Sequence, residues 1–330
     1  MAEAQVGNNR LKIPHSNSVT RFILERGILF LFAFLIIVLS FVTPNFLSVA
    51  NLSNVLLQSS IMAVLAIGVT FVIITGGIDV SVGSVLAIAS GAGVGLIKLA
   101  GAPWWIGIIA MPLVGLAFGI FNGVSVAYFR MPAFLVTLSA MAIGRGLTLA
   151  LSGGRSWYDL PEQFLLLNAA KVAGIPALLI IVLLIYVIAG IILTRTIYGR
   201  KVYAVGGNAE AARVSGINVR IITMSAYAVS GLTAGIAGLL QTARLNSFWA
   251  EMGTGFELRA IAAVVIGGTS LTGGIGNVWG TLVGVLLLGV INNALNLIGV
   301  PSNWQDVARG GVIFLAVLMD SVRTRYADRV

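Results

Sequence analysis

The chain has 330 residues, of which 58% are hydrophobic and only 9% are charged, whereas about 25% of the residues in a soluble domain are charged. This composition excludes a soluble globular enzyme and a disordered chain. With no cysteine and one histidine, His15, the sequence also excludes disulfides, thiol nucleophiles and most histidine-based metal or catalytic sites. The net charge is +9, and in so apolar a chain the excess of Lys and Arg is expected to set membrane orientation rather than to bind nucleic acid. Composition therefore predicts an all-α polytopic membrane protein.

The apolar runs predict about ten transmembrane helices in a membrane domain over 27–320, between a basic N-terminal segment, 1–26, and a C-terminal tail, 321–330. The first run follows a charged segment, as in a signal peptide, but no small-residue cleavage site comes after it, so we expect a membrane helix. Several runs are short or interrupted by glycine. The predicted helices are 27–42, 55–75, 82–101, 104–128, 133–151, 172–194, 221–242, 259–271, 279–299 and 306–320.

The charges predict how these helices are oriented. If the N-terminus is inside and the chain crosses ten times, thirteen of the 20 Lys and Arg residues fall in inner segments and five in outer segments. Such an excess is typical of the cytoplasmic side, so both termini and the polar loop 195–220 are predicted to be cytoplasmic. Tryptophans at the predicted outer helix ends fit an interfacial belt: Trp104, Trp105, Trp157, Trp249 and Trp304.

A glycine-containing tetrapeptide is repeated in the two halves of the chain. TGGI at 75–78 recurs at 272–275, an offset of 197 residues, and Gly83 and Ser84 then align with Gly280 and Thr281. In the predicted topology both copies join a descending helix to an ascending one, which indicates a parallel internal repeat; chance similarity in a glycine-rich chain is the alternative. Glycine-broken helices in corresponding halves point to a transport pathway.

Polar residues within or beside the predicted spans are the candidate pathway residues, because such groups are costly in a membrane. Asp79 could line the pathway or cap the next helix; capping or bracing is our preferred interpretation. Asn292 and Asn293 are adjacent and cannot share a helix face, so we expect one to brace a neighbouring helix and the other to face a cavity. Sparse neutral polar groups suit a sugar pathway better than a proton relay. The candidates for the pathway or its gating are Asp79, Ser81, Ser84, Asn122, Thr137, Arg145, Asn292 and Asn293.

The motifs of common catalytic sites are missing. None of the four lysines directly follows a glycine, so the chain has no Walker A loop and is not expected to hydrolyse ATP. It has no HExxH or GxSxG motif and no carboxylate cluster at metal spacing, so we predict no catalytic site, metal or cofactor in this chain. Glycines four residues apart predict close helix packing, within the chain or, alternatively, between subunits: Gly115, Gly119 and Gly123, and Gly231 and Gly235.

The loop 195–220 predicts a short helix outside the membrane. Gly206 and Gly207 permit a sharp turn, and Asn208 is a suitable N-cap residue. Glu210 lies in the first turn, where the helix dipole favours a carboxylate, and it shares a face with Arg213. Gly216 would end the helix; a solvated connector is the alternative.

Four stretches give the chain a family resemblance: TGGIDVSVGSVLAI (75–88), YGRKVYAVGGNAEAARVSGINV (198–219), ELRAIAAVVIGGTSLTGG (257–274) and LLGVINNALNLIGV (287–300). The sequence resembles the ribose-type membrane permease subunits of bacterial ABC importers, which move monosaccharides. This implies a permease in the bacterial inner membrane that forms a homodimer or heterodimer, ATPase domains on separate chains that bind the ATP, and a periplasmic sugar-binding protein. It also implies an ATPase-coupling helix formed by Gly206, Gly207, Asn208, Glu210, Ala211, Arg213 and Gly216.

One residue departs from the family pattern. Arg259 stands where the family often has an acidic residue, which leaves the exact sugar open. The alternative functions are an ion-coupled secondary sugar transporter, for which Asp79 is the main intramembrane carboxylate, and a membrane-embedded enzyme, for which the sequence offers no catalytic constellation.

Overall fold

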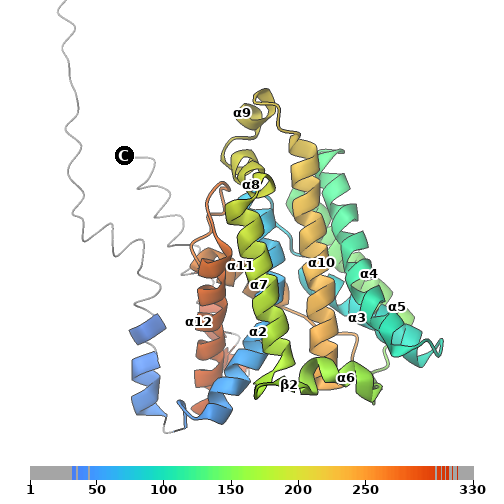
Figure 1. Ribbon diagram of the computed structural model, residues 1–330, viewed down its shortest axis with the longest axis vertical. Helices are drawn as coiled ribbons and strands as arrows, with labels where there is room; N and C mark the ends of the chain where they lie inside the picture. The colour runs from blue at the N-terminus through green and yellow to red at the C-terminus, as the bar shows by residue number, and fades with distance from the viewer. Residues whose placement is uncertain are drawn as a thin grey trace, which may run out of the picture.

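The computed structural model describes residues 32–34, 36–43, 45–301, 303–305, 307–308, 310–311, 314 and 318. Within these residues the protein is a helical bundle with a few two-residue strands (Figure 1). Val82–Lys98 (α3) and Phe32–Val42 are shorter apolar helices. The prediction of an all-α polytopic membrane protein is confirmed. Among the described residues, six helices are long and apolar enough to cross a membrane: α2 (Val49–Ile74), α4 (Trp104–Ala127), α5 (Ala133–Ser152), α7 (Ala177–Arg195), α10 (Val219–Leu245) and α12 (Val278–Leu297).

Three predicted helix boundaries differ from the structure by five or six residues, each for a local reason. α2 begins six residues before the predicted start, because the Ser48 side chain accepts a hydrogen bond from the backbone N–H of Asn51 and caps the helix. α7 begins only at Ala177, because β2 (Lys171–Val172) pairs with β3 (Ile175–Pro176) before it. α11 (Phe256–Ile266) stops before the predicted end at 271, and a glycine-rich loop follows. The segments 1–26 and 321–330 and much of the helix predicted at 306–320 lie outside the described residues.

The short elements lie at the two ends of the bundle. α8 (Ile197–Gly207) and α9 (Ala209–Val214) form one end, and α6 (Glu162–Ala169) lies at the other (Figure 1). β1 (Trp157–Tyr158) pairs antiparallel with β4 (Ser247–Phe248), with Trp157 opposite Phe248; in the β2–β3 pair Lys171 is opposite Pro176. The β1–β4 pair ties the segment after α5 to the segment after α10.

α2 is the central helix of the bundle. Every residue from Ala63 to Ile74 is buried, and the helix contacts α7, α10, α11 and α12. A helix that is apolar on all sides is expected to be surrounded by other helices. The core therefore lies around the C-terminal half of α2, close to the first TGGI segment.

α4 and α10 approach each other closely at their glycines. A Cβ on Gly115 would lie 2.2 Å from the carbonyl oxygen of Gly231, and a Cβ on Gly231 would lie 2.1 Å from that of Gly115. A Cβ on Gly235 would lie 2.4 Å from the carbonyl oxygen of Met111. Any side chain here would separate the helices, so the two glycine patterns serve packing within the chain, as we predicted.

Candidate functional site

Asp79 lies in the break between α2 and α3 and is almost fully buried, with 1% exposure. Its Oδ1 accepts hydrogen bonds from the backbone N–H of Ser81 (2.9 Å) and the Ser81 hydroxyl (2.6 Å). Its Oδ2 accepts one from the Ser230 hydroxyl of α10 (2.8 Å). The carboxylate thus holds the start of α3 and ties this start to α10, which is the geometry of a brace.

Two other candidates join the same cluster from α4 and α5. The Asn122 side-chain amide donates to the Ser81 hydroxyl (2.9 Å), and the Thr137 hydroxyl lies within 3.3 Å of the Ile78 carbonyl oxygen. The Tyr227 hydroxyl of α10 reaches the same carbonyl at 3.4 Å. The break after α2 is therefore held by side chains from three helices, and its exposed backbone groups find partners inside the protein.

Ser84 and Arg145 stabilise neighbouring contacts. The Ser84 hydroxyl donates to the Ser81 carbonyl oxygen (2.8 Å), and a Cβ on Gly144 of α5 would lie 3.0 Å from this hydroxyl. Arg145 is half-buried and donates from Nη1 to the Met252 carbonyl oxygen (2.7 Å), in the turn before α11. Arg145 thus binds a different segment from the Asp79 cluster.

The two adjacent asparagines of α12 separate as predicted. Asn293 forms a reciprocal amide pair with Asn51 of α2, with N···O distances of 2.7 and 3.0 Å. Asn292 lines a cavity of about 170 Å³ between α2, α10, α11 and α12. One asparagine therefore links two helices and the other faces an open space. The polar residues of the cavity wall are Gln58, Ser59, Gln241, Arg244, Arg259 and Asn292.

The two TGGI segments touch each other beneath α8. The backbone N–H of Gly274 donates to the Ile74 carbonyl oxygen (2.9 Å), and a Cβ on Gly273 would lie 3.0 Å from the backbone nitrogen of Gly76. A Cβ on Gly206 of α8 would lie only 1.7 Å from the Ile74 carbonyl oxygen and 2.6 Å from the Gly274 nitrogen. We call this contact of Ile74, Gly76, Gly206, Gly273 and Gly274 the glycine junction.

The prediction of a turn at Gly206 and Gly207 is wrong. Both residues are helical, in the last turn of α8, and the chain changes direction at Asn208 instead. Gly206 is required for its close approach to Ile74 rather than for backbone freedom. α8 is also bound to the second repeat copy, because the Tyr203 hydroxyl donates to the Gly276 carbonyl oxygen (2.7 Å). Burial raises the pKa of Tyr203, so this hydroxyl remains a donor at neutral pH.

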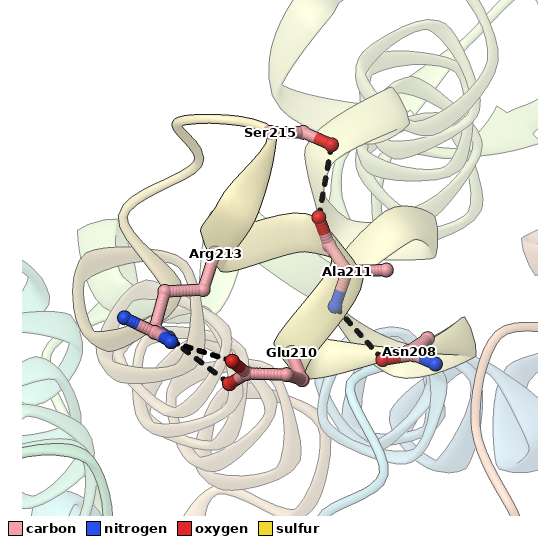
Figure 2. Close-up of polar contacts among 5 residues, drawn as sticks. All are labelled: Asn208, Glu210, Ala211, Arg213 and Ser215. Carbon is pink, nitrogen blue, oxygen red and sulfur yellow. Dashed lines mark hydrogen bonds and ion pairs between the residues drawn. The ribbon is translucent and has the colours of Figure 1, made fainter.

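α9 is the predicted short helix, although it ends at Val214, slightly before Gly216, whose φ of +82° takes the chain out of the helix. The Asn208 side-chain oxygen accepts from the backbone N–H of Ala211 (2.9 Å), and Arg213 donates to both oxygens of Glu210, with an Nε–Oε2 distance of 3.0 Å (Figure 2). These hydrogen bonds lower the pKa of Glu210. Both side chains are exposed, so the pair is accessible to a partner.

Comparison with known proteins decides the family. Residues 51–317 match the family described as the permease component of branched-chain amino acid transport systems, which is most of the chain. The chain belongs to this permease family. It is therefore a transport subunit and not an enzyme, in agreement with the missing nucleotide-binding loop in its sequence.

Its relatives include permeases named for sugars. The chain is 41% identical over 307 residues to the ribose import permease protein of Haemophilus influenzae, covering 92% of this chain and 95% of that protein. It is 42% identical over 288 residues to the ribose import permease protein of Bacillus subtilis, covering 87% and 89%. It is 38% identical over 296 residues to the D-allose transport system permease protein of Escherichia coli, covering 89% and 90%. These identities confirm the resemblance to ribose-type permeases. No solved structure matches the chain.

Sequence reasoning missed the glycine junction and most of the cavity wall. The repeated tetrapeptide was visible, but nothing in the sequence indicates that its two copies touch. Gln58 and Arg244 carried a weak signal, since both are polar residues near the ends of apolar helices.

Proposed function

We propose that this chain is the membrane permease of a bacterial importer that carries a ribose-like monosaccharide. A periplasmic binding protein delivers the sugar, and ATP hydrolysis on a separate ATPase chain drives transport. The observation that carries this proposal is the similarity to ribose and allose permeases over about nine-tenths of the chain. An ion-coupled mechanism gains no support from Asp79, because three hydrogen-bond donors already engage its carboxylate.

We further propose that the permease pairs with a second permease, either a copy or a sister chain, in the inner membrane, and that it crosses ten times with both termini cytoplasmic. The basic residues of the α8–α9 end support this orientation. The meeting of the two TGGI segments supports a parallel repeat, since each copy follows one helix of the bundle and precedes another.

α9 is the proposed docking element for the ATPase. It lies at the end of the bundle, exposes the Glu210–Arg213 pair, and is slim because Ala209, Ala211 and Ala212 surround that pair. It follows α8 directly, and α8 contacts both repeat copies through Gly206. A displacement of α9 by the ATPase would thus be transmitted through α8 to the two TGGI segments.

The test is reconstitution of the permease with its ATPase and binding protein in proteoliposomes, with D-ribose, D-allose, L-arabinose and D-galactose as candidate sugars. We expect uptake of at least one sugar that requires all three components and ATP. Hydrolysis by the purified permease alone, or uptake that persists without ATP, would contradict the proposal.

Charge reversal in α9 tests the docking step. Glu210→Lys should leave membrane insertion and binding-protein docking intact and should reduce co-purification of the ATPase. Glu162→Lys is the matched control, since Glu162 is an exposed first-turn acid of α6 at the opposite end. The double variant Glu210→Arg, Arg213→Glu restores the pair within α9; if it also restores ATPase association, the pair acts by stabilising the helix and not by direct contact.

A further inference from the structure

The cavity between α2, α10, α11 and α12 is more polar than the helices that form it. Its wall includes three amide side chains, Gln58, Gln241 and Asn292, and two guanidinium groups, Arg244 and Arg259. These residues come from α2 near the N-terminal end of the described chain and from the three consecutive helices α10, α11 and α12. Ionisable and amide groups are costly at membrane depth and face cavities or other protein groups there. Because these side chains all face one cavity, they indicate that the cavity binds a polar ligand.

Two polar groups of the wall have no partner in the described part of the chain. Ser59 is 5% exposed, and its hydroxyl makes no hydrogen bond there. Arg244 is half-buried, and none of the described residues accepts a hydrogen bond from its guanidinium or forms an ion pair with it. A guanidinium removed from water needs acceptors, and a ligand that carries several oxygens would supply them.

The chemistry of the wall defines the ligand class. Guanidinium groups are pure donors, whereas amides and hydroxyls both donate and accept, so the wall complements a solute with many hydroxyl groups. None of the described residues that line the cavity is Asp or Glu, which argues against a metal ion or another cation as the ligand. The Arg259 guanidinium stands over the Phe256 ring, 5.5 Å from its centroid, and both residues line the cavity.

We propose that this cavity binds the transported monosaccharide within the permease, with Arg244, Gln241 and Asn292 donating hydrogen bonds to sugar oxygens. This site rests on the proposed function and adds to it an intermediate binding site for the sugar within the membrane domain. Arg259 then acts on the sugar directly, as part of the same wall.

Because the chain contains no cysteine, one introduced cysteine reports on the cavity alone. Gln58→Cys in the reconstituted transporter is treated with a charged methanethiosulfonate reagent, with and without the sugar that the transporter carries. Sugar at ten times its dissociation constant should slow modification about tenfold, since the free fraction falls by one plus the ratio of concentration to dissociation constant. Arg155→Cys, in an exposed loop after α5, should react at the same rate in both conditions.

Arg244→Gln in the Gln58→Cys background should raise the half-protecting sugar concentration by about tenfold or more, because a charge-assisted hydrogen bond is lost. Leu288→Cys, at an apolar position of the same cavity wall, gives the same readout if Gln58→Cys does not assemble. Equal labelling with and without a sugar that the same vesicles transport would overturn the site and leave the proposed function standing. If none of the four candidate sugars is carried, the proposed function fails and the sugar site fails with it.

Discussion

Replacing Gly206 by alanine tests whether α8 must touch both repeat copies. The added Cβ would lie 1.7 Å from the Ile74 carbonyl oxygen and 2.6 Å from the Gly274 nitrogen. Ordinary contact begins at 3.4 Å, so the Cβ and the Ile74 oxygen would have to separate by a further 1.7 Å. Both neighbours are backbone atoms, and no side-chain rotation can relieve the clash. α8 must therefore move away from the junction.

Two unfavourable terms and one favourable term set the change in the free energy of unfolding. Overpacking of this kind costs about 1–3 kcal/mol, and weakening the Gly274–Ile74 hydrogen bond, 2.9 Å long, costs about 1 kcal/mol more. Alanine in a helix returns about 0.5–1 kcal/mol relative to glycine. The net loss in free energy of unfolding is about 1–3 kcal/mol, which corresponds to a melting temperature lower by several degrees.

The assay combines thermal unfolding of the purified permease, followed by tryptophan fluorescence, with uptake and binding-protein-stimulated ATP hydrolysis in proteoliposomes. Gly206→Ala should still bind the ATPase, because α9 is unchanged, but stimulated hydrolysis and uptake should fall more than about tenfold, as a 1.4 kcal/mol bias against the transmitting state would give. The control is Gly146→Ala in α5, where an added Cβ meets no atom of the described residues within 4 Å. Wild-type melting and transport by Gly206→Ala would refute the reasoning.

Two further predictions concern the buried polar contacts. Asp79→Asn keeps an acceptor for Ser81 and should retain much of the transport. Asp79→Leu leaves the Ser81 and Ser230 donors unpaired, at a cost of about 1–3 kcal/mol each, and should lower the folded yield and the uptake. Equal and complete loss of transport in both variants, with normal folding, would instead indicate a role for the charge. Asn51→Leu and Asn293→Leu, combined in a double-mutant cycle of unfolding free energies, should show a coupling of about 0.6 kcal/mol and at most about 1.7 kcal/mol; strictly additive effects would mean that the amide pair contributes nothing.

The sequence predicted the long helices well because a membrane helix is specified by one local property, a run of about 20 apolar residues. α8 was not predicted. Its sequence, IYGRKVYAVGG, is short and mixed, and helices of this length are stabilised mainly by tertiary contacts. In the structure Thr196 caps α8 by accepting from the Gly199 N–H (3.1 Å), and Val202 and Val205 are buried. Of these features, only a possible N-cap residue, Thr196, can be seen in the sequence; the burial of Val202 and Val205 cannot.

The candidate site was predictable to the extent that it depends on helix faces. Adjacent asparagines must point in different directions, and Asn292 and Asn293 do so. Their partners could not be predicted, because Asn51 is 242 residues from Asn293 in the sequence. Gly206 shows the same limit: a glycine is explained equally well by a turn or by a close contact, and only the position of Ile74 distinguishes the two.

The two repeat copies make different contacts, and this difference affects how a movement of α8 could be transmitted to the membrane helices. In the first copy Asp79 fixes the break through Ser81 and Ser230, so that copy is tied to α3 and α10. The aligned position in the second copy is Gly276, which has no side chain, and its carbonyl oxygen is held by Tyr203 of α8. A movement of α8 would therefore meet resistance from the first copy and would carry the second copy with it. The second copy leads directly into α12, which forms one wall of the cavity, so displacement of α8 would change the cavity from that wall.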